Sequence, residues 1–352
     1  MGKCIEIIDE LNKSGQLSNE QWIDLLKNYT DVDRLYAAKL AREIADDIYG
    51  KDIYIRGLIE ISNHCKNDCY YCGIRCSNNR ADRYRLNKEQ ILACCDTGWK
   101  LGFRTFVMQG GEDAYYSDDW YVDVIQSIKE KYSECAITLS IGERTKESYQ
   151  RLYNAGADRY LLRHETATKE HYNRLHPERM SLDNRKECLY NLKEIGYQVG
   201  CGFMVGSPYQ TVENLANDMK FIHELGPHMV GIGPFIPHKD TPFKDEKAGD
   251  LHLTTFLLSL IRIMEKNVLL PATTALGTIS PTGREEGIMA GANVIMPNLS
   301  PTSVRDKYLL YDNKICTGDE ASECRKCIEF KMKKIGYNIV ETRGDYKTKK
   351  RN

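Results

Sequence analysis

Three cysteines lie close together in the stretch Cys65-Lys66-Asn67-Asp68-Cys69-Tyr70-Tyr71-Cys72, with the spacing CxxxCxxC. The stretch follows the apolar run Gly57-Leu58-Ile59-Glu60-Ile61-Ser62, which predicts a buried β-strand. Thiolates on one short loop after a strand can hold three irons of a cubane 4Fe-4S cluster, because such clusters take cysteine ligands. The fourth iron would remain open to a small molecule.

The same cysteines could instead bind zinc or an ordinary four-cysteine cluster. Structural zinc takes four closed ligands, typically from two separate cysteine pairs. Cys76 follows Cys72 by four residues and could supply a fourth thiolate. We interpret Cys76 as a bystander and keep zinc, a four-cysteine cluster and unliganded thiols as alternatives.

Length and charge restrict the class of protein. A chain of 352 residues suits one barrel of alternating strands and helices. Its 49 basic and 50 acidic residues give a net charge of -1, so we expect neither nucleic acid nor an anionic membrane as a partner. The 13 cysteines, without a signal peptide, indicate metal ligation in a reducing compartment. No apolar run reaches the ~20 residues that span a bilayer, and we expect a cytoplasmic, oxygen-sensitive protein.

The order of secondary-structure signals predicts an α/β fold. Residues 1–50 are expected to form an N-terminal helical cap, with helices at 3–12, 19–27 and 32–49 and a helix cap at Ser18. Residues 51–305 are expected to form a complete (β/α)8 TIM-type barrel, with a partial six-stranded barrel as the alternative. Residues 306–352 would form a C-terminal, cysteine-containing extension. The eight predicted strands are 57–62, 105–109, 136–140, 159–163, 198–204, 229–233, 270–274 and 293–296.

Ligand-binding side chains are expected where the strands end, because parallel barrel strands bring their C-terminal ends together. The second predicted strand leads into Gln109-Gly110-Gly111-Glu112, where glycines let a ligand approach the backbone. The fourth carries Arg159, Arg163 and then Glu165, which are costly in a strand unless paired or facing a polar cavity. Alternation places these three on one face. Facing inward, they would bind an anionic or carboxylate-bearing substrate; a structural ion-pair network is the alternative.

Two later regions also carry candidate ligands. The segment Gly231-Ile232-Gly233-Pro234-Phe235 could wrap an adenine or be a tight structural loop, and the hydroxyls of Thr273 and Thr274 could contact substrate oxygens or the backbone. A second cysteine group, Cys316, Cys324 and Cys327, follows the barrel. Three thiolates are one short of a closed zinc site, so we favour a surface accessory iron-sulfur cluster, with zinc or unliganded thiols as alternatives.

Several of these motifs resemble a known superfamily. The cysteine spacing, with the aromatic Tyr71 just before Cys72, resembles the radical SAM superfamily, and Gly110-Gly111-Glu112 resembles its GGE motif. Longer strings resemble the FeFe-hydrogenase maturases of the HydE type, within the biotin synthase-like group of that superfamily. The strings lie at 59–63, 156–166, 231–238, 271–275 and 291–298, and the resemblance covers about residues 20–335.

The resemblance implies an anaerobic enzyme with a 4Fe-4S cluster that cleaves S-adenosylmethionine (SAM) reductively to a 5'-deoxyadenosyl radical. It further implies action on an iron-cyanide-carbonyl cysteine complex during assembly of the hydrogenase H-cluster. A reductant such as a ferredoxin or flavodoxin and other hydrogenase maturases are the implied partners.

Together the motifs and the resemblance assign candidate site residues. The catalytic cluster ligands are Cys65, Cys69 and Cys72. The candidate cofactor-binding residues are Tyr71, Gly111, Glu112, Ser140, Glu165, Arg185, Met204 and Ile232. The candidate substrate-binding residues are Gln109, Thr138, Arg159, Arg163, Thr273, Thr274 and Tyr308. The ligands of a possible second iron-sulfur cluster are Cys316, Cys324 and Cys327.

Departures from related families restrict the choice of function. Biotin synthase needs a second cluster inside its barrel, and Cys201 lacks a full set of partner ligands, so sulfur insertion is not expected. Gly110 stands where the maturases more usually carry serine. The alternative enzyme is a methylornithine synthase-like lysine mutase of pyrrolysine biosynthesis, against which the cysteines after the barrel argue. A non-enzymatic iron-sulfur or zinc protein, needing neither cavity nor SAM, is the alternative of another class.

Overall fold

A six-stranded parallel sheet forms the centre of the protein. The computed structural model describes residues 2–318 and 321–348. The strand order is β2-β3-β4-β5-β6-β8, and every neighbouring pair is parallel. Helices connect successive strands, as the alternating sequence pattern predicts. The strands are β2 (Gly57–Ser62), β3 (Thr105–Gly110), β4 (Ala136–Ser140), β5 (Arg159–Leu161), β6 (Gln198–Cys201) and β8 (Met229–Val230).

Two smaller sheets and isolated bridges lie beside this sheet. β1 (Asp52–Ile55) pairs in parallel with both β10 (Val294–Ile295) and β11 (Asn338–Val340). β7 (Met204–Val205) pairs with β9 (Gly233–Pro234). Further parallel bridges join Met229 to Leu269, Pro271 to Val294, and Leu58 to Asn298. These bridges lead from β8 through residues 269–271 and 294–298 back to β2.

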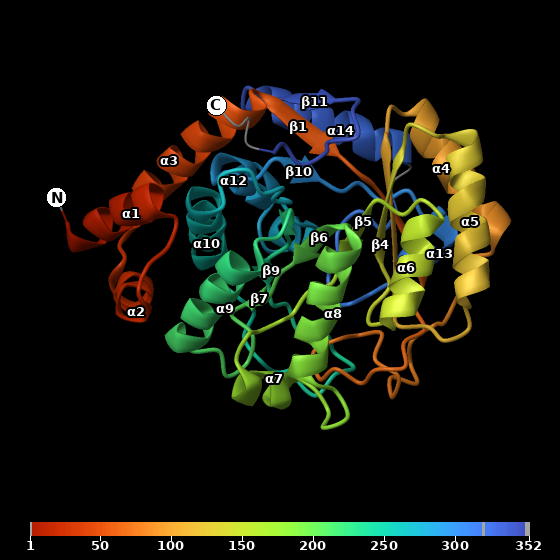
Figure 1. Cartoon of the computed structure of the whole chain (residues 1–352), viewed down its shortest axis with the longest axis horizontal. Coiled ribbons are helices and arrows are strands. Elements are labelled where there is room, and N and C mark those ends of the chain that lie inside the picture. The colour runs from red at the N-terminus through yellow and green to blue at the C-terminus, as the bar shows by residue number, and fades with distance from the viewer. Residues whose placement is uncertain (1, 319–320, 349–352) are drawn as a thin grey trace.

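Helices cover the outside of the sheet and precede it at the N-terminus (Figure 1). The first three are α1 (Lys3–Ser14), α2 (Asn19–Asn28) and α3 (Asp31–Tyr49), of which α1 and α2 project to the left in Figure 1. The helices among and after the strands are α4 (Lys88–Lys100), α5 (Asp118–Lys131), α6 (Lys146–Asn154), α7 (Lys169–Leu175), α8 (Leu182–Ile195), α9 (Val212–Leu225), α10 (Leu251–Met264), α11 (Thr274–Ile279), α12 (Gly283–Met289), α13 (Thr302–Arg305) and α14 (Ala321–Lys334).

Local sequence sets the start of several helices. Ser18, Thr30, Asn87 and Thr211 each accept a hydrogen bond from the backbone N–H three residues on, and the residue there bonds back to the cap. This capping box satisfies two backbone donors that a helix start otherwise leaves unpaired, and such a cap contributes about 1 kcal/mol. The cap predicted at Ser18 is therefore confirmed.

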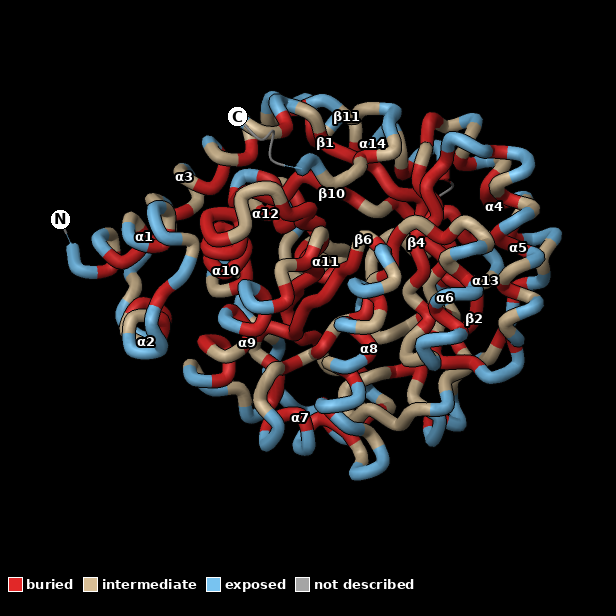
Figure 2. Tube along the Cα trace, in the orientation of Figure 1, coloured by how far each residue is buried: buried red, intermediate tan, exposed pale blue. Residues whose placement is uncertain are grey.

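The core lies between the strands and the helices packed on them, as the buried parts of the trace show in Figure 2. Every residue of β2 is buried, which agrees with the predominance of apolar residues in this strand; Glu60 and Ser62 are its two buried polar residues. α10 is buried from Thr254 to Met264 because it packs against α1, α3, α12 and β9. The N-terminal helices thus contact the rest of the protein through α9, α10 and α12.

The predicted alternation of strands and helices is confirmed, but the strand predicted at 159–163 ends at Leu161, and those predicted at 198–204 and 229–233 are each divided between two sheets, as β6 and β7 and as β8 and β9. The strand predicted at 270–274 is wrong: Leu269 and Pro271 form only isolated bridges, and Thr274 begins α11. β1 and β11 were not predicted, and β11 brings the C-terminal extension back beside the start of the sheet domain. Residues 319–320 and 349–352 of that extension lie outside the described residues. Within the described ranges, no helix is both long enough and apolar enough to cross a membrane.

Candidate active site

One cavity of about 350 Å³ lies where β3, β4 and β5 end. Its volume is in the range that holds a small-molecule ligand. Three loop cysteines line it, together with twelve of the predicted cofactor- and substrate-binding residues: Tyr71, Gly111, Glu112, Ser140, Glu165, Arg185, Met204, Gln109, Arg163, Thr273, Thr274 and Tyr308. Thr138, Arg159 and Ile232 do not line this cavity and are buried elsewhere. The predicted site is therefore largely assembled in one place.

The cysteine loop packs directly against the segment that follows β3. The backbone N–H of Glu112 donates to the Cys65 Sγ at 3.4 Å, and that of Lys66 donates to the Glu112 carbonyl at 3.0 Å. A Cβ atom at Gly111 would lie 2.1 Å from the carbonyl oxygen of His64. Gly111 is therefore required for contact with the cysteine loop itself, a reason that the sequence did not reveal.

Two arginines stabilise the cysteine loop and the turn after it through hydrogen bonds. Arg75 donates to both carboxylate oxygens of Asp68, at 2.7 and 2.6 Å, and holds the pKa of that carboxyl well below its usual range. Arg83 donates to the backbone carbonyls of Ile74, Arg75 and Asn78 at 2.9, 2.7 and 3.1 Å. These bonds fix the loop without using the cysteine sulfurs. Cys76 lies on this turn but is exposed and does not line the cavity.

The three loop thiols fit a cluster better than a single metal ion. Among the described residues, no three His, Cys, Asp or Glu side chains converge closely enough to hold one ion. A cubane spreads its cysteine ligands over separate irons and does not need that convergence. Burial raises the pKa of Cys72 to about 12 and also raises that of Cys65 and Cys69, so bound iron would have to displace the thiol protons.

Charged groups on the cavity wall leave atoms available for a ligand. Arg185 Nε lies 2.7 Å from Glu143 Oε1, and Arg163 Nη2 lies 3.2 Å from Glu165 Oε2, but neither contact has hydrogen-bond geometry. Within the described chain, Arg163 Nε, Glu165 Oε2 and the Thr273 hydroxyl have no hydrogen-bond partner. Unpaired buried polar atoms are costly, so these groups indicate a polar ligand.

Tyr71 is held in the cavity wall by a buried histidine. His176 Nδ1 lies 2.9 Å from the Tyr172 carbonyl and must donate to it, which leaves Nε2 to accept from the Tyr71 hydroxyl at 3.1 Å. Burial lowers the pKa of His176 to about 3, so the imidazole is neutral at pH 7. This support was not predicted, because His176 lies 105 positions from Tyr71 in the sequence.

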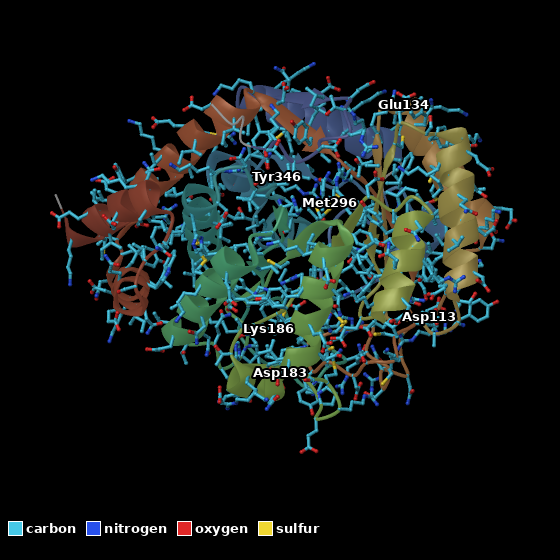
Figure 3. The ribbon with its side chains drawn as sticks, in the orientation of Figure 1. Asp113, Glu134, Asp183, Lys186, Met296 and Tyr346 are labelled. Atoms are coloured by element: carbon cyan, nitrogen blue, oxygen red, sulfur yellow. The ribbon has the colours of Figure 1, made fainter. Side chains whose placement is uncertain are left out.

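Arg159 faces the opposite end of the sheet from the cysteine loop. Its Nη2 donates to Asp345 Oδ1 at 2.6 Å and to the Arg343 carbonyl at 2.8 Å. The Thr105 hydroxyl donates to the same carbonyl, so the C-terminal segment 343–346 binds the first residues of β3 and β5. In Figure 3, Tyr346 of this segment and Asp113, near the cysteine loop, lie on opposite sides. The inward substrate contact predicted for Arg159 is replaced by the predicted alternative, a structural ion-pair network.

A second ion pair lines the cavity and was not predicted. Lys314 Nζ lies 2.6 Å from Glu60 Oε1 and donates to the Tyr308 carbonyl at 2.8 Å. The Tyr308 hydroxyl accepts from Gln109 Nε2 at 3.3 Å. Glu60 is buried on β2, where the sequence indicated only an interruption in an apolar run. The pair attaches residues 308–314, which lie between α13 and α14, to the cavity wall.

The second cysteine group is only partly assembled. Cys316 and Cys324 line a small void of about 10 Å³ together with Arg284 and Lys314. Cys327 follows Cys324 by one turn of α14 and is exposed. Arg284 Nη1 lies 3.9 Å from Cys316 Sγ, and its Nη2 donates to the Thr274 hydroxyl at 3.2 Å. The small void beside Cys316 and Cys324 therefore adjoins the main cavity, because Thr274 lines both spaces.

Comparisons with known proteins agree with this geometry. Residues 59–222 match the family described as the radical SAM superfamily. The chain is 45% identical over 298 residues to the FeFe hydrogenase maturase subunit HydE of Thermotoga maritima, covering 85% of each sequence. It is 29% identical over 292 residues to the 3-methylornithine synthase of Methanosarcina barkeri, covering 82% of this chain and 81% of the other.

Solved structures have the same fold. The crystal structure of the methylornithine synthase PylB superimposes with a TM-score of 0.82 at 25% identity, covering 95% of this chain and 97% of that chain. The structure of HydG, a maturase of the FeFe hydrogenase, gives a TM-score of 0.80 at 22% identity, covering 95% and 75%. The high identity over most of its length shows that this chain belongs to the HydE family within the radical SAM superfamily and is a radical SAM enzyme of hydrogenase maturation.

Proposed function

We propose that the enzyme acts on a cysteine-bound iron-cyanide-carbonyl complex during assembly of the hydrogenase H-cluster. One observation carries the proposal: a single cavity of about 350 Å³ is lined both by the three loop cysteines and by the unpaired polar atoms of Arg163 and Thr273. A radical source and an anchor for a charged substrate would then share one cavity. The HydE relative supports this substrate class by its place in hydrogenase maturation.

The radical SAM superfamily implies a 4Fe-4S cluster and SAM as cofactors. When bound, they supply a 5'-deoxyadenosyl radical on reduction. Cys65, Cys69 and Cys72 would hold the cluster, since all three line the cavity and lie on one loop, which the hydrogen bond from Arg75 to Asp68 stabilises. The backbone N–H of Glu112 would continue to donate to the Cys65 sulfur, and such bonds stabilise a thiolate ligand.

The charged residues nearest the cysteine loop would bind SAM. Arg185, already beside Glu143 and Glu112, offers a cation for the SAM carboxylate, and Glu165 offers an anion for a cationic or hydroxyl group. Tyr71, supported by His176, presents an aromatic ring to the same space. Gly111, Ser140 and Met204 complete the proposed SAM contacts from the cavity wall.

The remaining polar wall would hold the substrate. Arg163 and the Thr273 and Thr274 hydroxyls offer donors to a carboxylate or to cyanide and carbonyl ligands. Gln109 and Tyr308 lie beside them and are linked by a hydrogen bond of 3.3 Å. A ligand bound across this wall would help to exclude water and oxygen from the radical.

We further infer that residues 51–305 close into the complete (β/α)8 barrel, with residues 1–50 as its cap and 306–352 as its extension. The isolated bridges from β8 through residues 269–271 and 294–298 to β2 support closure. The extension would hold an accessory iron-sulfur cluster at Cys316, Cys324 and Cys327, supported by the adjoining positions of Cys316 and Cys324. A ferredoxin or flavodoxin would reduce the enzyme, and other hydrogenase maturases would use its product.

A lysine mutase is the second candidate, because the methylornithine synthases align over most of this chain in sequence and structure. The discriminating experiment incubates the reduced, cluster-loaded enzyme and SAM with either lysine or a cysteine-bound iron-cyanide-carbonyl complex. We expect 5'-deoxyadenosine formation to be stimulated by the iron complex and not by lysine. Formation of 3-methylornithine, detected by mass spectrometry, would replace the proposed substrate with lysine.

A further inference from the structure

The backbone of Glu165 is held in a conformation that its side chain disfavours. Its φ is 66°, in the left-handed region, where a residue with a Cβ is destabilised by ~1–2 kcal/mol. The side chain is 14% exposed, lines the cavity and approaches Arg163. Strain of this kind persists only where the surroundings impose it, and it is common at ligand sites. The contacts that impose it therefore affect the site.

Backbone hydrogen bonds join Glu165 to the segment that contains Gly202 and Met204. The Glu165 N–H donates to the Gly202 carbonyl at 3.0 Å, and the Met204 N–H donates to the Glu165 carbonyl at 3.4 Å. Gly202 in turn donates from its N–H to His164 Nδ1 at 3.3 Å. Since Nδ1 accepts this bond, a neutral His164 carries its proton on Nε2. His164, the residue before Glu165, is thus linked through its side chain to Gly202, which directly follows β6.

Asp218 of α9 holds the other side of Glu165. Its Oδ1 accepts from the Ala167 N–H at 2.5 Å and lies 3.4 Å from His164 Nε2. Both His164 and Asp218 have fully buried side chains. Burial lowers the pKa of His164 and raises that of Asp218, which favours neutral forms of both groups. One carboxyl group therefore contacts both the residue before Glu165 and the residue two positions after it.

Neither His164 nor Asp218 lines the cavity. Their side chains accept hydrogen bonds from the backbone N–H groups of Gly202 and Ala167, and the His164 ring also packs on Phe203 and Phe221. The two hydrogen bonds lie on either side of Glu165, which is the residue of this segment that reaches the cavity. A buried aspartate is expensive to maintain, and an apolar residue would pack at the same place without that cost. What an apolar residue would not supply is the acceptor for the Ala167 N–H.

We propose that Asp218 and His164 are positioning residues that hold Glu165 toward the cavity and thereby set the affinity for SAM. The inference rests on the proposed role of Glu165 in binding SAM. Loss of either acceptor would let residues 164–167 relax from the strained conformation and move the Glu165 carboxylate away from its ligand. Misplacing a binding group by about 1 Å lowers the affinity for its ligand by about tenfold or more.

The test compares Asp218→Ala and Asp218→Asn in the full-length, cluster-reconstituted enzyme. Asp218→Asn keeps the Oδ1 acceptor, whereas Asp218→Ala removes it. The Kd for SAM, measured by equilibrium dialysis, is expected to rise about tenfold in the alanine variant and to stay near the wild-type value in the asparagine variant. Turnover at saturating SAM should fall by a smaller factor than the Kd rises.

Leu225→Ala is the matched control, because Leu225 is fully buried on the same helix, two turns beyond Asp218. It should lower thermal stability without changing the Kd for SAM. Equal Kd values in Asp218→Ala and Leu225→Ala, at equal loss of thermal stability, would overturn the proposed positioning role. A wild-type enzyme that binds no SAM would instead overturn the proposed function.

His164→Phe gives an independent test if the alanine variant is poorly folded. Phenylalanine retains the volume of a ring, while the acceptor for the Gly202 N–H is lost. We expect a rise in the Kd for SAM and faster amide hydrogen exchange at residues 165–167, the latter measurable without the cluster. Wild-type affinity in this variant would contradict the inference.

Discussion

Arg159 donates to Asp345 at 2.6 Å, joining the first residue of β5 to the C-terminal segment across 186 positions of sequence. The Arg159 side chain is completely buried, whereas that of Asp345 is 40% exposed. Gln198, the first residue of β6, also donates to Asp345, at 3.2 Å. Segment 343–346 therefore packs against the end of the sheet where β5 and β6 begin, and the buried arginine contacts that segment and does not line the cavity.

Asp345→Asn should destabilise the protein without weakening SAM binding. Breaking a buried pair costs about 3–5 kcal/mol, and because Asp345 is partly exposed we expect a loss nearer to ~2 kcal/mol. Urea unfolding of the cluster-free protein measures it. Glu341→Gln, whose weak contact with Arg104 is 4.0 Å long, serves as the control. Equal stability of the two variants would show that the Arg159 contact contributes little.

The same carboxyl group predicts a loss of stability in acid. Burial alone would raise the pKa of Asp345, but Arg343 and Arg159 lower it to about 2, below the unfolded value of 3.8. Its contribution is therefore present above pH 3.8 and is lost as the pH falls toward 2. Asp345→Asn should remove this part of the acid dependence, which unfolding curves at several pH values would reveal.

His176 predicts a second pH effect in a higher range. Burial lowers its pKa from 6.5 to about 3, so between these values the unfolded chain binds a proton that the folded chain does not. Stability should be fully present above pH 6.5 and fall with acidification, by up to ~1.4 kcal/mol per pH unit. His176→Gln should have a shallower dependence than wild type from about pH 6.5 to about pH 5. Parallel curves would mean that His176 is protonated in the folded state.

Arg163→Gln should weaken substrate binding much more than SAM binding. A hydrogen bond to a charged group contributes ~1.5–3 kcal/mol, equivalent to about a tenfold to hundredfold rise in the substrate KM. The measurement is 5'-deoxyadenosine formation as the iron complex is varied at saturating SAM. Arg80→Gln is the control, because Arg80 is 83% exposed and pairs with Asp240 on the surface. An unchanged KM in Arg163→Gln would place the substrate anchor elsewhere.

Substitutions at Glu165 separate backbone strain from ligand contact. Glu165→Gly and Glu165→Ala both remove the carboxylate and should both raise the Kd for SAM. Glycine adopts a φ of 66° without strain, so Glu165→Gly should be the more stable of the two by about 1 kcal/mol. Comparison of their unfolding free energies checks the strain. Greater stability of the alanine variant would contradict it.

The sequence predicted the cysteine loop and most of the cavity because these features depend on local order. The CxxxCxxC motif directly follows β2, so its three thiols lie at the end of that strand whatever its place in the sheet. Gly111 directly follows β3 and lies beside them. Parallel pairing then gathers the ends of β3, β4 and β5 around one space. None of these inferences required a contact between distant parts of the chain.

Several of the features that were missed depend on such distant contacts. Alternation places Arg159 and Arg163 on one face of a strand, but it does not distinguish the start of the strand, near the C-terminal segment, from its end, near the cavity. Asp345, which holds Arg159, lies in a segment without periodicity. Similarly, Lys314 is an ordinary loop lysine until the fold brings it to Glu60.

The central claim is that the Cys65-Cys69-Cys72 loop holds the radical-generating cluster and that Cys316, Cys324 and Cys327 are accessory. It is tested most directly by measuring 5'-deoxyadenosine from the wild type, Cys69→Ala and Cys324→Ala. Each protein is reconstituted anaerobically with iron and sulfide, then given dithionite, SAM and the cysteine-bound iron complex. We predict product from the wild type and Cys324→Ala and none from Cys69→Ala. Product from Cys69→Ala, or none from fully loaded and reduced wild type, would contradict the account.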